Sequence, residues 1–208
     1  MLKQPFIHII IGLILSVIIG CSDKVELHPI AENTTILAFG DSLTYGTGTS
    51  RDKSYPAVLE KLTHHKVVNA GKPGEISAKG LLRLPTLIKQ YQPGLIIICH
   101  GGNDILRKLD LNITRHNIQQ MIDLARQQNI QVILIGVPEF GLFLNTASIY
   151  NTLAEQNNIP YLRDTIGNIL AESSLKSDRI HPNAKGYKRL ATDITMLLRE
   201  SGAIKYPR

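Results

Sequence analysis

Short, continuous runs of apolar residues alternate with longer amphipathic stretches from residue 34 onward, and this alternation restricts the fold more than any other feature. Apolar runs without a polar face are typical of strands that are buried on both sides. The segments between them repeat apolar residues every three or four positions, as amphipathic helices do. A strand–helix–strand–helix order predicts a parallel sheet that is covered by helices on both faces.

The predicted strands are Thr35–Phe39, Lys66–Asn69, Leu95–His100, Gln131–Val137 and the shorter Pro160–Leu162. Helices are predicted over Gly80–Tyr91, around Ile118–Ala125, around Tyr150–Ala154 and from about Ala184 to Glu200. The length of 208 residues suits one such domain, and we find no internal repeat. The predicted fold class is therefore α/β, with three layers in which a five-stranded parallel sheet lies between helices.

The first twenty residues differ in composition from the rest. Lys3 precedes an almost wholly apolar run, Phe6–Ile19, which is shorter than the roughly 20 residues that span a bilayer. Val17–Cys21 looks like the lipobox of bacterial lipoproteins, whose cysteine is lipidated and becomes the first residue. We therefore expect a signal peptide over residues 1–20, a lipidated tether over 21–33 and the domain over 34–208. In the alternative, an uncleaved signal anchor, Cys21 is merely a small residue.

A lipid on Cys21 predicts attachment to a membrane of the bacterial cell envelope, with the domain facing the periplasm or the cell surface. Ser22 stands where an aspartate is associated with inner-membrane retention, which favours the outer membrane. Lipidation also leaves Cys99 as the remaining thiol, within an apolar run that predicts burial. The formal net charge is +6, but Lys and Arg are scattered and no nucleic-acid-binding motif accompanies them, so no nucleic-acid partner is predicted.

Three unusual groups directly follow the first three predicted strands. They are Gly40–Leu43 (GDSL), Asn69–Gly74 (NAGKPG) and Gly101–Asp104 (GGND). Because the carboxyl ends of parallel strands meet at one edge, a serine, a glycine-rich turn and an asparagine are expected to lie together. Acyl transfer needs a hydroxyl that attacks a carbonyl and N–H donors for the oxygen that becomes negative.

A serine nucleophile also needs a base, and His181 is the strongest candidate among the histidines. It lies in Asp178–Pro182 (DRIHP), where a separation of three residues lets the Asp178 carboxylate reach the imidazole. His100 ends the third predicted strand, and for it a packing role is favoured over catalysis. A lone Asp-x-x-His is more often a surface turn, so a catalytic role for His181 depends on the other motifs in the sequence.

The blocks GDSL, NAGKPG, GGND and DRIHP occur in this order between residues 40 and 182, and they resemble those of the SGNH hydrolases, also called the GDSL esterase and lipase family. More narrowly, VVNAGKPGEISAKGLLRLPTLIKQYQP followed by GGNDILR looks like the branch that contains bacterial thioesterase I, lysophospholipase and arylesterase. The resemblance implies a flavodoxin-like SGNH hydrolase fold and no cofactor or metal.

The resemblance also implies catalytic roles for three residues. Ser42 would be the nucleophile and His181 the general base and acid, with Asp178 orienting His181. Asp41 is expected to support the turn that carries the nucleophile.

Three oxyanion donors are implied in the same way: the backbone N–H groups of Ser42 and Gly74 and the side-chain amide of Asn103. Gly74 is chosen over Gly71 because it precedes an acidic residue, Glu75, as the corresponding glycine does in relatives.

These implications predict a serine esterase that hydrolyses carboxylic esters or thioesters of small-molecule or lipid substrates through an acyl-serine intermediate. The segment VPEFGLFLNTASIYNTLAE departs from relatives, so substrate choice stays open. Its apolar residues could line an acyl channel or belong to the core; they are Phe140, Leu142, Phe143 and Leu144. The alternatives are a carbohydrate O-acetyl esterase acting on envelope glycans and a non-catalytic lipoprotein that uses the fold for binding.

Overall fold

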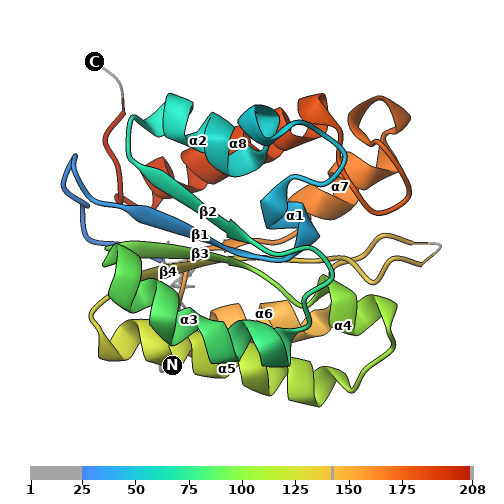
Figure 1. The fold of residues 1–208 in the computed structure, drawn as a ribbon, viewed down its shortest axis with the longest axis horizontal. Helices are drawn as coiled ribbons and strands as arrows, with labels where there is room; N and C mark the ends of the chain where they lie inside the picture. Colours follow the sequence, from blue (N-terminus) through green and yellow to red (C-terminus); the bar gives the residue numbers. More distant parts are fainter. Residues whose placement is uncertain (1–24, 142, 207–208) are drawn as a thin grey trace, which may run out of the picture.

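The computed structural model describes residues 25–141 and 143–206, which form three layers with helices on both faces of one sheet (Figure 1). All strand pairs are parallel, and the strand order is β2-β1-β3-β4-β5. The strands are β1 (Ile36–Gly40), β2 (Val67–Gly71), β3 (Leu95–Cys99), β4 (Gln131–Ile135) and β5 (Tyr161–Leu162). The predicted fold class is confirmed.

The two outer layers are separate sets of helices (Figure 1). One face of the sheet is covered by α1 (Ser42–Tyr45), α2 (Tyr55–Thr63), α7 (Thr165–Ala171) and α8 (Ala184–Glu200). The other face is covered by α3 (Ser77–Tyr91), α4 (Gly102–Leu106), α5 (Leu111–Gln127) and α6 (Ser148–Asn157). Two short 3-10 turns, Arg51–Lys53 and Ser173–Leu175, complete the described elements.

The sheet is buried most completely in its middle. Every residue of β1 and β3 is buried, which explains why their sequences show no alternation of polar and apolar residues. β1 lies between β2 and β3. After β1 the chain passes first to β2 on one side and then crosses to β3 on the other side of β1. Open parallel sheets bind ligands at such a switch point.

Helix α3 begins at Ser77, three residues before the predicted start. The buried carboxylate of Asp104 explains the earlier start, because it accepts hydrogen bonds from the Ser77 N–H at 2.8 Å and the Ser77 Oγ at 2.5 Å. The bond to the N–H satisfies one of the donors that a helix leaves free at its first turn. It also joins the start of α3 to the start of α4.

Residues 25–33, predicted as part of a tether, pack against the domain. The Leu27 N–H donates to the Ser201 carbonyl at 2.7 Å, and the Ile30 N–H donates to the Ala203 carbonyl at 2.9 Å. The His28 N–H donates to the side chain of Gln131, the first residue of β4, at 2.6 Å. This segment therefore lies at the edge of the sheet where the strands begin. Cys21 and the predicted signal peptide lie outside the described residues.

Within the part of the chain that the structure describes, no helix combines the length and the apolar character needed to cross a bilayer.

Candidate active site

Ser42 is the first residue of α1, directly beyond the carboxyl end of β1. Gly40 lets β1 lie close against β3 just before this serine, because a Cβ at that position would lie 2.0 Å from the carbonyl oxygen of Cys99. Asp41 caps α1, since its Oδ1 accepts a hydrogen bond from the Leu43 N–H at 3.1 Å. The nucleophile predicted from the sequence is thus placed at the switch point of the sheet.

The structure brings Ser42, His181 and Asp178 into one hydrogen-bonded chain. His181 Nε2 lies 3.1 Å from Ser42 Oγ, and His181 Nδ1 lies 2.8 Å from Asp178 Oδ2. The other carboxylate oxygen, Oδ1, accepts hydrogen bonds from the N–H groups of Ile180 and His181, both at 2.8 Å. A carboxylate held in this way keeps the hydrogen on Nδ1 and leaves Nε2 to accept the serine proton.

Asp178 remains a carboxylate at neutral pH. Partial burial raises the pKa of Asp178, but hydrogen bonds from the Ile180 N–H and from His181 outweigh burial and bring the pKa below its usual value. The side chain is 52% exposed, so water also solvates the charge.

Gly74 lies in the turn between β2 and α3, which the Glu75 N–H closes by donating to the Lys72 carbonyl at 3.2 Å. Its φ of 75° is in the left-handed region, whereas a Cβ there would meet no atom within 4 Å. Conformation, not crowding, therefore favours glycine at this position. Within the part of the chain that the structure describes, the N–H groups of Gly74 and Ser42 donate no hydrogen bond.

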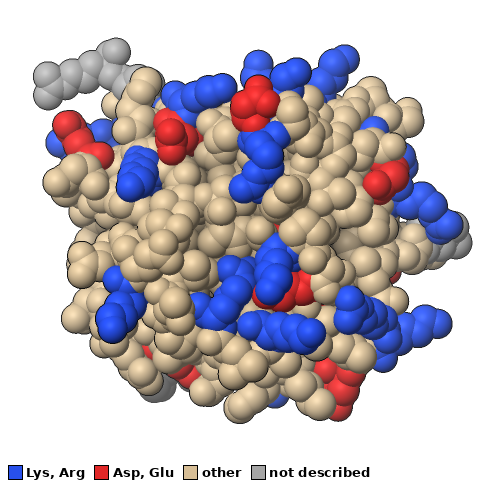
Figure 2. Space-filling model, viewed as in Figure 1, with Lys and Arg blue, Asp and Glu red and all other residues tan. Residues whose placement is uncertain are grey.

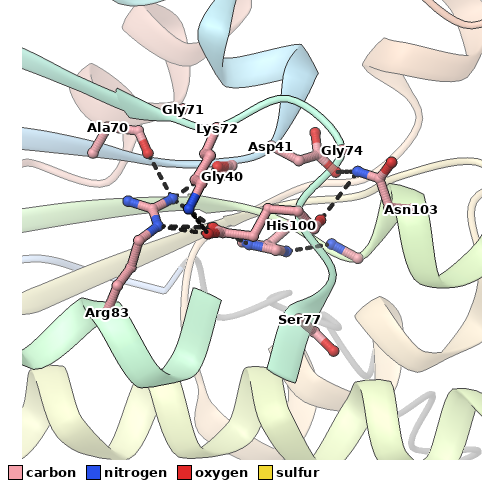
Figure 3. Close-up of polar contacts among 12 residues, drawn as sticks. Gly40, Asp41, Ala70, Gly71, Lys72, Gly74, Ser77, Arg83, His100 and Asn103 are labelled. Atoms are coloured by element: carbon pink, nitrogen blue, oxygen red, sulfur yellow. Dashed lines mark hydrogen bonds and ion pairs between the residues drawn. The ribbon is translucent and has the colours of Figure 1, made fainter. Parts of the chain in front are cut away.

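Asn103, in α4, directs its side-chain amide between two acceptors (Figure 3). Its Nδ2 donates to the Glu75 carbonyl at 3.1 Å and to Asp41 Oδ2 at 3.3 Å. Both hydrogens of this amide are thus engaged, so an oxyanion would compete with the longer bond to Asp41. The structure places the three predicted oxyanion donors at the carboxyl ends of β1, β2 and β3.

The buried Asp41 side chain contacts both the nucleophile turn and Asn103. It is 1% exposed, and burial raises its pKa, although the neighbouring His100 and the N–H groups of Leu43 and Gly102 oppose that rise. Its hydrogen bonds join the nucleophile turn to α4, in agreement with the supporting role expected for it.

Two contacts next to this site were not predicted from the sequence. The Arg83 side chain and His100 both contact the carboxylate of Glu75, which is buried behind Gly74. Arg83 follows Glu75 by eight residues and lies between the apolar Leu81 and Leu84, a placement that could have marked it as a buried partner.

The apolar residues of the segment after β4 differ in how far they are buried. Phe140 and Leu144 are partly buried against the core, and Phe143 is 72% exposed; Leu142 lies outside the described residues. Phe143 and Leu144 line a surface hollow of about 580 Å³, which Lys176 and Arg179 also border, close in sequence to Asp178.

The described residues contain no group of three or more His, Cys, Asp or Glu side chains placed to hold a metal ion.

Comparisons with known proteins identify this arrangement. Residues 38–189 match the GDSL-like Lipase/Acylhydrolase family. Esterase TesA of Pseudomonas aeruginosa is 30% identical over 188 residues, which cover 84% of this chain and 92% of that protein. The thioesterase 1/protease 1/lysophospholipase L1 of Escherichia coli K12 is 34% identical over 157 residues, covering 72% and 76%. A crystal structure of TesA superposes with a TM-score of 0.73 at 28% identity, covering 80% of this chain and 98% of that one.

Proposed function

This chain belongs to the GDSL-like lipase/acylhydrolase family, the SGNH hydrolases, and is a carboxylic ester hydrolase; we propose that it works through an acyl-serine intermediate on Ser42. The observation that carries this proposal is the continuous hydrogen-bonded chain from Ser42 Oγ through His181 to Asp178, with steps of 3.1 Å and 2.8 Å. Each residue has the partner that its role requires.

In the first step, His181 Nε2 takes the proton of Ser42 Oγ while Oγ forms a bond to the carbonyl carbon of the ester. The carbonyl π electrons move to oxygen, which accepts hydrogen bonds from the N–H groups of Ser42 and Gly74 and from Asn103 Nδ2. The Asp178 carboxylate stabilises the imidazolium that His181 becomes.

The tetrahedral intermediate then collapses. The carbonyl re-forms, the bond to the leaving oxygen or sulfur breaks, and His181 gives its proton to that atom. In the second half of the reaction, His181 takes a proton from water while the water oxygen attacks the acyl-serine. Collapse of this second tetrahedral intermediate breaks its bond to Ser42 Oγ, which takes the proton back from His181, and releases the acid.

The proposed substrates are carboxylic esters or thioesters of the arylesterase, lysophospholipase or thioesterase type. The names of the relatives support this class, and Phe143 and Leu144 give the mixed polar and apolar hollow two apolar side chains that an acyl chain could contact. Hydrolysis of p-nitrophenyl esters from acetyl to palmitoyl, measured beside a Ser42→Ala control, tests the proposal. Activity confined to acetyl would favour the carbohydrate O-acetyl esterase, and no activity from a folded chain would favour a binding lipoprotein.

We also propose that the chain is a lipoprotein of the bacterial cell envelope, anchored through Cys21 and held at the outer membrane. The lipobox-like Val17–Cys21 supports this proposal. The described chain begins at the edge of the sheet where the strands start, so an anchor there would leave the edge that carries Ser42 unobstructed. Mass spectrometry of the chain purified from bacterial membranes should show an acylated Cys21 at the amino terminus; an intact Met1 would reject the anchor.

A further inference from the structure

The carboxylate of Glu75 is buried under a basic part of the surface. Glu75 is the only acidic residue between positions 66 and 92, a segment with five basic residues: Lys66, Lys72, Lys79, Arg83 and Lys89. Figure 2 shows Lys and Arg side chains gathered around a partly covered acidic group where Figure 1 places β2 and α3. The Glu75 side chain is only 2% exposed. A buried charge of this kind is costly unless it is paired, so its partners decide its role.

Three cationic or polar groups converge on this carboxylate (Figure 3). Arg83 Nε donates to both oxygens, at 2.8 and 3.0 Å, and Arg83 Nη2 lies 2.7 Å from Oε2. His100 Nε2 lies 3.3 Å from Oε2, and the exposed Lys72 Nζ lies 3.7 Å from Oε1. Burial raises the pKa of Glu75, but hydrogen bonds from His100 and Arg83 outweigh it and lower the pKa to about 2. Glu75 is therefore charged throughout the neutral range.

His100 acts as a fixed donor to Glu75. The Gly101 N–H donates to His100 Nδ1 at 2.9 Å, so the neutral ring carries its hydrogen on Nε2, which faces the carboxylate. The ring is fully buried, and α3 approaches it so closely that a Cβ at Gly80 would lie 2.3 Å from Nε2. The ring of Phe39 packs against it at a centroid distance of 5.5 Å.

Arg83 ties the Glu75 carboxylate to the ends of two strands. Its Nη2 donates to the carbonyl of Ala70, in β2, at 2.9 Å and to that of Gly40, the last residue of β1, at 3.2 Å. The Arg83 guanidinium also lies over the ring of Phe39, 4.5 Å from its centroid. One guanidinium thus fixes the Glu75 side chain relative to the strands that precede Ser42 and Gly74.

Glu75 touches both of the oxyanion donors that lie outside the nucleophile turn. It follows Gly74 directly in the chain, so anchoring Glu75 restricts where Gly74 and its N–H can lie. Its carbonyl also accepts the hydrogen bond that holds Asn103 Nδ2, at 3.1 Å. Movement of Glu75 would therefore displace two donors together, and displacements near 1 Å at a reacting centre can cost roughly 10²-fold in rate.

We propose that Glu75 is a positioning residue for ester hydrolysis, whose buried carboxylate, held by Arg83 and His100, fixes the turn that presents Gly74 and Asn103 to the oxyanion. The inference rests on the proposed oxyanion role of these two residues. Arg83 has a second effect in this arrangement: it neutralises a carboxylate that would otherwise repel the developing negative charge. A glutamine at position 75 keeps the size of the side chain but loses the charge that binds Arg83.

The experiment compares Glu75→Gln with Asp193→Asn, a matched carboxylate-to-amide change in the Arg189–Asp193 ion pair of α8, whose carboxylate also accepts a hydrogen bond from Thr165. We expect kcat for p-nitrophenyl butyrate to fall tenfold or more in Glu75→Gln while KM changes less than about threefold, because the oxyanion forms only after binding. An alkyl trifluoromethyl ketone, which forms an oxyanionic adduct with an active-site serine, should bind Glu75→Gln more weakly in proportion to the loss of kcat/KM. Asp193→Asn should match the wild type in all three measurements.

A folded Glu75→Gln variant with wild-type kcat, or one whose loss appears in KM with ketone affinity unchanged, would overturn the inference. Wild-type hydrolysis that does not depend on Ser42 would instead defeat the proposed function itself. If Glu75→Gln does not fold, His100→Leu and His100→Gln decide the question in its place. Loss of kcat in the leucine variant with recovery in the glutamine variant, which keeps a donor and an acceptor, would support the inference; equal kcat in both would overturn it.

Discussion

His181 Nε2 lies 3.1 Å from Ser42 Oγ, although the two residues are 139 positions apart in the chain. The turn that carries His181 is closed by the Ser177 N–H, which donates to the His181 carbonyl at 2.9 Å. Helix α8 then joins this turn to the nucleophile side of the sheet, because the Tyr187 hydroxyl donates to the Thr47 carbonyl at 2.8 Å. The meeting of serine and histidine thus depends on how α8 packs.

Replacing Asp178 with asparagine should remove most of the turnover without unfolding the chain. The amide can no longer hold the hydrogen on His181 Nδ1 or stabilise the imidazolium, and the corresponding change in a serine protease lowers kcat about 10⁴-fold. Because Asp178 is 52% exposed, water replaces part of its effect, and we expect a loss of about 10³-fold. Steady-state kinetics measures this loss of kcat, and circular dichroism of the same sample shows whether the variant is folded. A variant within tenfold of wild-type kcat would show that Asp178 does not orient His181.

Asn103→Ala should lower kcat by about 10²- to 10³-fold, the usual cost of losing one oxyanion donor. The same change leaves Asp41 Oδ2 and the Glu75 carbonyl without their shared donor, so a modest loss of thermal stability should accompany it. Asn112→Ala, at an exposed position near the start of α5, is the matched control and should behave as wild type. Equal kcat in the two alanine variants would remove Asn103 from the oxyanion site.

Glu75→Gln should lose stability relative to the wild type mainly above pH 4.5. The folded-state pKa of Glu75 is about 2, below its usual 4.5, so the unfolded chain binds the proton first as pH falls. The contribution of the charged carboxylate is therefore complete above pH 4.5 and declines from there toward pH 2. Urea unfolding of both proteins between pH 3 and pH 7 should give a stability difference that shrinks on the acid side. A difference that stays constant or grows toward pH 3 would contradict the ion pair.

Phe143→Ala should shift the acyl-length preference of the enzyme toward shorter chains. Phe143 is 72% exposed beside the hollow it lines, so its removal takes away contact area without opening the core. At roughly 0.8 kcal/mol per buried methylene, we expect kcat/KM for decanoyl esters to fall about threefold to tenfold relative to butyryl esters. Met196→Ala, at an apolar position on α8 that is 51% exposed, is the control. An unchanged chain-length profile would place the acyl chain elsewhere.

The sequence predicted the sheet well because burial on both faces leaves a direct trace in composition. β1 and β3 are fully buried; the predicted β1 is shifted by one residue at both ends, and the predicted β3 is one residue too long at its carboxyl end. Helix α8 was predicted at its observed bounds because its apolar residues repeat on one face. Helix α2 was not predicted, since it buries only Tyr55, Pro56 and Leu59 and its apolar face is correspondingly short.

Only the residues of the candidate site that belong to recognisable sequence motifs could be predicted. Ser42, Asp178, His181, Gly74 and Asn103 lie where motif order placed them. The contact between Glu75 and His100 could not be predicted, because it joins the loop after β2 to the end of β3 across the buried face of α3. The engagement of both Asn103 amide hydrogens also follows from three-dimensional placement alone.

The most direct test of the account is to trap the acyl-enzyme. The purified chain is mixed with p-nitrophenyl butyrate, quenched in acid within the first turnovers and digested for mass spectrometry, with Ser42→Ala treated in parallel. We expect one butyryl group on the peptide that contains Ser42, no adduct in the variant and a loss of turnover of at least about 10³-fold. Hydrolysis that persists in Ser42→Ala, or a butyryl group on another residue at equal yield in both proteins, would contradict it.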